Sequence, residues 1–208
     1  TRSDGTLRLV MRNEALETHA IRRVRVLAAP RPPGGRVLAG VDGRFREAFD
    51  LRPAQSCRAP EGDCAAAVSA WDDRERASEA DGDDLATREL IELTFAPARG
   101  RVGLVLGARQ TLLSTFLFYQ TMAHFGRSAG AFLASLERRG EQAREAMGMA
   151  RELGGIEVSV AEGTGEYRSV GSFEEAGPIA GDIQLGPFDL AGAGPLRVRL
   201  RLTKGHWR

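Results

Sequence analysis

Lysine is almost absent from this chain of 208 residues, which contains 28 arginines but a single lysine, Lys204. Asparagine is equally scarce and occurs only at Asn13. This bias is typical of a GC-rich genome, so the arginines by themselves do not indicate phosphate or carboxylate recognition. The 29 basic and 28 acidic residues leave a formal net charge of +1. Because the chain lacks the strong positive field of nucleic-acid-binding proteins, we do not expect a nucleic-acid partner.

Catalytic motifs are also missing. The chain has three histidines and contains no phosphate-binding glycine loop, no His-Glu-x-x-His and no Gly-x-Ser-x-Gly sequence. We therefore expect no catalytic residues, no cofactor and no enzymatic activity. A hydrolase that uses two carboxylates stays open, because such a pair comes together only in the folded chain.

Long apolar runs are absent as well, since no stretch reaches the roughly 18 apolar residues that cross a bilayer. The first residues show no secretory leader, and the last ones follow directly on a strand-like run. We expect the 208 residues to form a single β-rich domain that is part of a longer chain. Any membrane association would then depend on flanking segments.

The chain has two cysteines, Cys57 and Cys64, on either side of a segment with Pro and Gly that permits a turn. A disulfide between them is sterically feasible, and two reduced thiols are the alternative. The redox compartment decides between the two. Without further soft ligands nearby, a zinc site is not expected.

Period-two alternation predicts most of the strands. Residues 196–202 alternate strictly between aliphatic residues and arginine, which predicts one buried and one solvated face. Residues 101–107 are apolar on both faces, so we expect a central strand there. The remaining predicted strands cover residues 6–11, 20–28, 89–95, 155–160, 166–170 and 181–185, with a hairpin over 36–49 that turns at Asp42 and Gly43.

Two helices are predicted inside this strand-rich pattern. Residues 111–125 form the most apolar stretch and read as a buried helix, which would leave His124 at least partly buried. Residues 128–153 predict a second helix. Residues 50–88 read mostly as surface loop with a short helix near 64–71. The fold class is thus mainly β with an α insertion, an antiparallel β-sandwich or jelly roll with the helical insertion over 111–153.

Two resemblances accompany this pattern. The run of residues 12–19, Arg-Asn-Glu-Ala-Leu-Glu-Thr-His, resembles a region of large uncharacterised secreted or lipoprotein-like bacterial proteins. The alternating strand that precedes Trp207 is similar to strands of galactose-binding-type jelly rolls. The resemblances imply export and a β-rich fold, and they imply no reaction.

Three polar or aromatic groups are candidate sites. An acidic loop with Asp81, Asp83 and Asp84 could bind Ca²⁺, with a solvated loop as the alternative. Trp71, Tyr167 and Trp207 could form a sugar-stacking platform, with packing as the alternative. The polar turn could hold a cation or an acid–base pair, but we expect its residues to fix the backbone instead. These turn residues are Asn13, Glu14, Glu17, Thr18 and His19.

The pattern as a whole favours a non-catalytic, extracytoplasmic structural or protein-interaction module of a larger bacterial assembly. The first surfaces to consider for a protein partner are the apolar helix over 111–125 and the arginine face of residues 196–202. The alternatives are a carbohydrate-binding module, assisted by calcium at the acidic loop, and the carboxylate-pair hydrolase.

Overall fold

The computed structural model describes residues 6, 8, 22–26, 28, 33–70, 72, 74–138, 152–174 and 181–208. The chain divides into two compact units, Thr1–Pro30 and Arg31–Arg208. In the first unit, residues 22–26 form no strand, and Val24 and Val26 are more than half exposed. The strand predicted over 20–28 is therefore wrong for these residues, since no described strand pairs with them. Of the strand predicted over 6–11, only residues 6 and 8 are described, and neither is in a strand. The polar turn over 12–19 lies outside the described residues.

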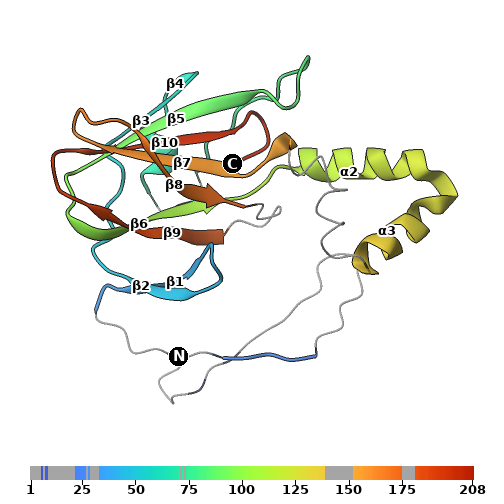
Figure 1. Ribbon diagram of the computed structural model, residues 1–208, viewed down its shortest axis with the longest axis horizontal. Coiled ribbons are helices and arrows are strands. Elements are labelled where there is room, and N and C mark those ends of the chain that lie inside the picture. The colour runs from blue at the N-terminus through green and yellow to red at the C-terminus, as the bar shows by residue number, and fades with distance from the viewer. Residues whose placement is uncertain are drawn as a thin grey trace. The chain divides into compact units, whose positions relative to one another are not determined.

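The second unit is a β-sandwich with a helical insertion (Figure 1). One sheet has four strands in the order β2-β1-β9-β6 and the other has six in the order β4-β3-β5-β10-β7-β8. The pairings are antiparallel except for β1 with β9. The strands are β1 (Arg36–Gly40), β2 (Phe45–Ala48), β3 (Ser56–Ala59), β4 (Gly62–Asp63), β5 (Arg88–Phe95), β6 (Gly100–Ala108), β7 (Ile156–Glu162), β8 (Arg168–Phe173), β9 (Gly181–Leu190) and β10 (Leu196–Thr203). The predicted fold class is confirmed.

The core lies between the two sheets. Strand β10 contributes its aliphatic residues, among which Val198 is fully buried, while the arginines between them point to the outer face. Leu104 of β6 and Leu185 of β9 pack into the same cluster from the four-stranded sheet. Alternation along β10 thus places one complete row of side chains in the core, as the sequence predicts.

Strand β6 occupies a different place from the predicted one. Its apolar residues on both faces predict a central strand, but β6 is the last strand of the four-stranded sheet and pairs only with β9 among the described strands. Only Leu104 of this strand is buried. The prediction of a central position is wrong, because period and composition do not show which strands lie at an edge.

The helical insertion follows β6 directly. It consists of α2 (Leu112–Phe125), the 3₁₀ turn η1 (Gly126–Ser128) and α3 (Ala129–Arg138). A further short helix, α1 (Ala65–Val68), follows the β3–β4 hairpin. This hairpin lies inside the segment that was expected to be mostly loop. Figure 1 shows α2 and α3 beyond the end of β6.

Candidate functional site

Helix α2 is mostly apolar, yet none of its described side chains is buried. No charged residue occurs between Arg109 and Arg127. Leu112, Phe116 and Tyr119 are 69%, 58% and 67% exposed. Their spacing of four and three residues places them on one face of the helix. The helix is where the sequence predicts it, but the prediction that it is buried is wrong.

His124 near the end of α2 is exposed as well. The expectation that it packs in the protein interior is therefore wrong, for the same reason as for the rest of the helix. An apolar sequence predicts a buried helix only when another element of the chain covers it.

The start of α2 is fixed to the last residues of the described chain. The Thr111 hydroxyl accepts the backbone N–H of Leu113 and donates to the Gly205 carbonyl at 2.8 Å. The Thr111 backbone N–H donates to the His206 carbonyl at 2.9 Å, and Arg109 and Arg208 exchange two backbone hydrogen bonds. Because Thr111 caps the helix and is itself anchored, α2 begins at a defined point next to the sandwich.

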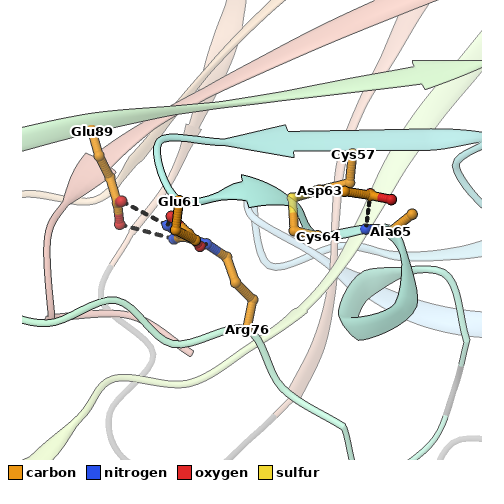
Figure 2. The surroundings of a disulfide bond; sticks show 7 residues. All are labelled: Cys57, Glu61, Asp63, Cys64, Ala65, Arg76 and Glu89. Carbon is orange, nitrogen blue, oxygen red and sulfur yellow. Dashed lines mark hydrogen bonds and ion pairs between the residues drawn. A yellow bond between two sulfur atoms is a disulfide. The ribbon is translucent and has the colours of Figure 1, made fainter.

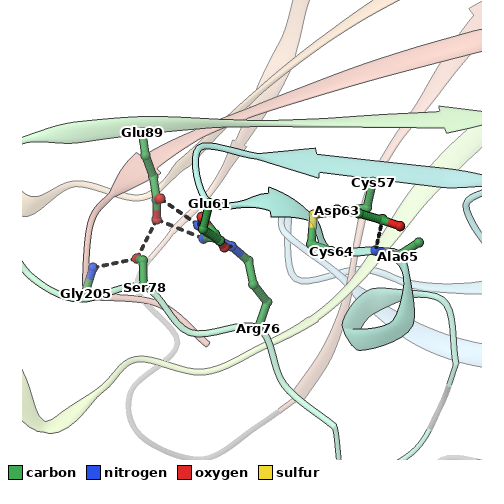
Figure 3. Close-up of polar contacts among 9 residues, drawn as sticks. All are labelled: Cys57, Glu61, Asp63, Cys64, Ala65, Arg76, Ser78, Glu89 and Gly205. Carbon is green, nitrogen blue, oxygen red and sulfur yellow. Dashed lines mark hydrogen bonds and ion pairs between the residues drawn. A yellow bond between two sulfur atoms is a disulfide. The ribbon is translucent and has the colours of Figure 1, made fainter.

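A buried ion pair lies beside this anchor (Figure 3). The Arg76 guanidinium donates to both carboxylate oxygens of Glu89, at 2.8 and 2.7 Å, and to both oxygens of Glu61. Ser78 donates to Glu89 at 2.7 Å and accepts the backbone N–H of Gly205. Burial lowers the pKa of Arg76, but the hydrogen bonds to the two carboxylates outweigh it and raise the pKa above its ordinary value. The arrangement holds the segment before β5 against the C-terminal turn, and the sequence gives no signal for it.

The two cysteines form a disulfide that joins β3 to the start of α1 (Figure 2). Both are buried in the core, and Cys64 donates its backbone N–H to the Cys57 carbonyl. Asp63 accepts the backbone N–H of Ala65 at 2.9 Å and so holds the first turn of α1. Of the two redox states considered for this pair, the structure has the disulfide.

The arginine face of β10 is largely engaged by its own sheet. Arg199 lies opposite Glu92 in the strand register and pairs with it at 2.6 Å, and Arg201 pairs in the same way with Glu157 at 3.1 Å. Arg197 donates to the Gly165 carbonyl at 2.7 Å. The strand register therefore explains why this face offers few uncommitted charges to a partner.

Two of the predicted aromatic platform residues lie apart. Trp207 is 3% exposed and belongs to the core cluster. Tyr167 lies under the guanidinium groups of Arg199 and Arg197, at 4.0 and 5.0 Å from its ring centre, on the outer face of the six-stranded sheet. Trp71 lies outside the described residues. The predicted platform is therefore wrong for Tyr167 and Trp207, because Trp207 packs in the core whereas Tyr167 packs against the arginines of the outer face.

In the predicted calcium loop, the carboxylates of Asp81 and Asp84 accept hydrogen bonds from the loop itself. Asp81 accepts the backbone N–H groups of Asp83 and Asp84 at 3.0 and 3.2 Å and the hydroxyl of Thr87 at 3.1 Å. These hydrogen bonds lower the pKa of Asp81. Asp84 accepts the backbone N–H of Ala86. In the described part of the chain, no group of three or more His, Cys, Asp or Glu side chains is arranged to hold a metal ion.

Glu162 fixes the turn between β9 and β10. Its carboxylate accepts the backbone N–H groups of Ala191, Gly192 and Ala193, at 3.0, 2.6 and 3.1 Å. The hydrogen bond from Ala191 contributes most to a lowered pKa of Glu162, followed by those from the other two residues. This side chain has a structural role that the sequence does not reveal.

A groove of ≈ 1280 Å³ runs along β6 between the two sheets. Every residue from 101 to 109 lines it, and so do Asp182, Gln184 and Phe188 of the neighbouring strand β9. The facing wall comes from the segment over 46–54 and from α1 and the residues after it. At its inner end the groove meets the core, where it is lined by apolar residues of β5 and β10, among them Ile91, Leu93, Phe95 and Leu200.

No protein-family model, curated protein or solved structure matches this chain. The helices among the described residues include none with the length and apolar character needed to cross a membrane. The functional argument therefore rests on the surfaces of the chain itself.

Proposed function

We propose that the chain is a non-catalytic interaction module that binds a protein partner through helix α2. The observation that supports this proposal is the exposure of Leu112, Phe116 and Tyr119 on one face of a helix without charged residues. A contiguous row of exposed large apolar side chains ordinarily marks a surface that another molecule covers. With 14 residues, α2 is about 21 Å long, which is shorter than the roughly 30 Å of a bilayer core.

The composition of this face fits a protein partner. Exposed aromatic side chains contribute much of the binding energy at protein interfaces, and Tyr119 combines a large apolar surface with a polar hydroxyl. The anchor at Thr111 gives the helix a fixed starting point, which reduces the entropy lost when a partner binds.

We further propose that the module works outside the cytoplasm of a bacterium. The disulfide between Cys57 and Cys64 supports this, because such bonds persist mainly in oxidising compartments. The strong preference for arginine over lysine supports a GC-rich bacterial source.

The carbohydrate-binding and hydrolase alternatives have less support. The former requires an exposed aromatic platform, whereas Trp207 is in the core. The latter requires two carboxylates that face a substrate, whereas the buried carboxylate of Glu89 is committed to Arg76.

The test compares two variants of α2 that each introduce one negative charge. Phe116→Glu changes the proposed binding face, whereas Thr121→Glu changes an exposed residue about half a turn away around the helix. Each tagged variant is expressed in the native host, and the mass and composition of the purified particle are measured. We expect Thr121→Glu to retain the partner of the wild-type protein and Phe116→Glu to lose it. Equal retention by both variants would contradict the proposal.

A further inference from the structure

Among the described strands, β6 is the last of the four-stranded sheet, and its own residues carry little of the protection that is usual at a sheet edge. Natural edge strands carry charges, prolines or a covering segment that keep other chains from pairing with them. Between Arg101 and Arg109, β6 has no charged residue and no proline. Among the described strands it pairs with β9 alone.

The pairing geometry of β6 is regular over residues 104–108. A shift in register interrupts the ladder between Val102 and Leu104, and from Leu104 to Ala108 the partners follow one another without interruption. The free edge of this regular part is therefore straight enough to accept a further strand of about five residues, in the spacing of an ordinary ladder.

The groove beside this edge fits an extended peptide better than a small molecule. Its volume of ≈ 1280 Å³ exceeds the about 300–1,000 Å³ typical of small-molecule sites. It runs along residues 101–109, and apolar side chains of the opposite sheet line its inner end. A strand added here would find main-chain partners along β6 and apolar contacts for every second side chain.

The charges around the groove indicate the composition of the peptide. Eight arginines and five carboxylates line it. Most of these arginines pair with a carboxylate, as Arg109 does with Glu75. Arg99 and Arg101 are exposed at one end of β6, and no ion pair joins either of them to another described residue. Acidic side chains are therefore favoured on the solvent side of an added strand at this end.

We propose that the free edge of β6 binds an extended segment of a partner protein, in which apolar and acidic residues alternate, as an additional strand of the four-stranded sheet. This inference rests on the proposed interaction function and adds a second contact that is separate from α2. The apolar side chains of the segment enter the groove, and its carboxylates face Arg99 and Arg101. Binding by strand addition derives its affinity from main-chain hydrogen bonds and its specificity from the alternate side chains.

Synthetic peptides test this inference. The probe is a fluorescent, end-capped octapeptide of alternating Val and Glu, compared with one of alternating Val and Lys. Binding to the 208-residue chain is followed by fluorescence anisotropy. We expect the Val/Glu peptide to bind at least about fivefold more tightly than the Val/Lys peptide, because two arginines face it. A third peptide carries the Val/Glu side chains but N-methylated backbone nitrogens at alternate positions, and it should lose binding if strand pairing is the mode.

Charge reversal at the edge provides the second arm. Arg101→Glu should weaken binding of the Val/Glu peptide by about two- to fivefold, the effect of one exposed ion pair, and strengthen binding of the Val/Lys peptide. Arg127→Glu is the matched control, because Arg127 lies in η1 and does not line the groove. It should leave both affinities unchanged.

Three results would overturn the inference. The first is the absence of binding by the Val/Glu peptide, and the second is equal binding of the N-methylated peptide. The third is that Arg101→Glu leaves the affinities for the Val/Glu and Val/Lys peptides unchanged. Protection of the β6 edge by another segment of the same chain or by a second copy would appear as the first of these. If peptide binding fails while Phe116→Glu still loses the native partner, the edge inference is wrong and the interaction function through α2 stands.

Discussion

Replacement of Arg76 by methionine should destabilise the fold strongly. The Arg76 side chain is 8% exposed and that of Glu89 is 1% exposed, so both charges are largely removed from water. Without the guanidinium, Glu89 keeps only the hydrogen bond from Ser78. Breaking a buried ion pair by removal of one partner costs about 3–5 kcal/mol of unfolding free energy. For a domain of this size, that loss corresponds to a decrease in Tm of about 6–20 °C.

Urea unfolding at pH 7, followed by tryptophan fluorescence, measures this loss. The double variant Arg76→Met/Glu89→Leu should recover most of the stability, because removing both charges replaces an unpaired buried carboxylate by an apolar contact. Glu61 is half-exposed and can be solvated in both variants.

The control is Arg52→Met, which removes an exposed ion pair with Asp50 and should change the unfolding free energy little, because solvent screens such a pair. A loss for Arg76→Met no larger than for this control would refute the reasoning. A double variant as unstable as Arg76→Met would refute it as well.

Three further predictions concern stability. Replacement of both Cys57 and Cys64 by alanine should lower the unfolding free energy by about 2–3 kcal/mol, because the disulfide no longer reduces the entropy of the unfolded chain. The urea midpoint of this variant, compared with that of the oxidised wild-type protein, measures the loss. The pKa of Glu162 is lowered in the folded state, so its ionised carboxylate stabilises the fold above the unfolded pKa. This stabilisation disappears as the pH falls through the folded pKa, and the difference in Tm between wild type and Glu162→Gln should therefore shrink towards acidic pH. Burial, and secondarily the charge of Arg88, lower the pKa of His206, whose Nε2 lies 3.0 Å from the Gln110 amide nitrogen. Wild-type stability should then decrease as the pH falls below the unfolded histidine pKa of about 6.5, and a pH-independent Tm between 5 and 7 would contradict this.

Much of the fold follows from local sequence pattern. The strict alternation of residues 196–202 predicts β10 and its buried face, and the residues of β5 and β6 are predicted to within one or two positions. Helix α2 is likewise found where the apolar run places it. These elements follow from periodicity and apolar composition, which depend on neighbouring residues alone.

The remaining features depend on contacts between distant residues. The β3–β4 hairpin is short, and its strand β3 is held in the sheet by pairing with β5. Sequence period cannot show that β6 is the last described strand of its sheet, nor that no described side chain of α2 is buried. Strand β9 extends past the predicted end at 185 through Pro187, a residue that ordinarily argues against a strand interior. Its pairing with β6 continues there beyond the register shift.

The candidate sites, too, divide into features that depend on nearby residues and features that depend on distant ones. Cys57 and Cys64 are close in sequence, and their pairing was one of two states that the spacing left open. The buried pair of Arg76 and Glu89 spans 13 residues and has no motif. Trp207 was grouped with Tyr167 on aromatic character alone, which does not distinguish the two faces of a sheet.

The mass of the particle that contains this chain in its native host tests the central proposal most directly. The protein is isolated from membrane and secreted fractions in mild detergent, and its mass and polypeptide composition are determined by light scattering and mass spectrometry. The proposed interaction function predicts a particle of fixed composition that contains a second polypeptide and loses it on Phe116→Glu. A lone monomer in both fractions would contradict the proposal.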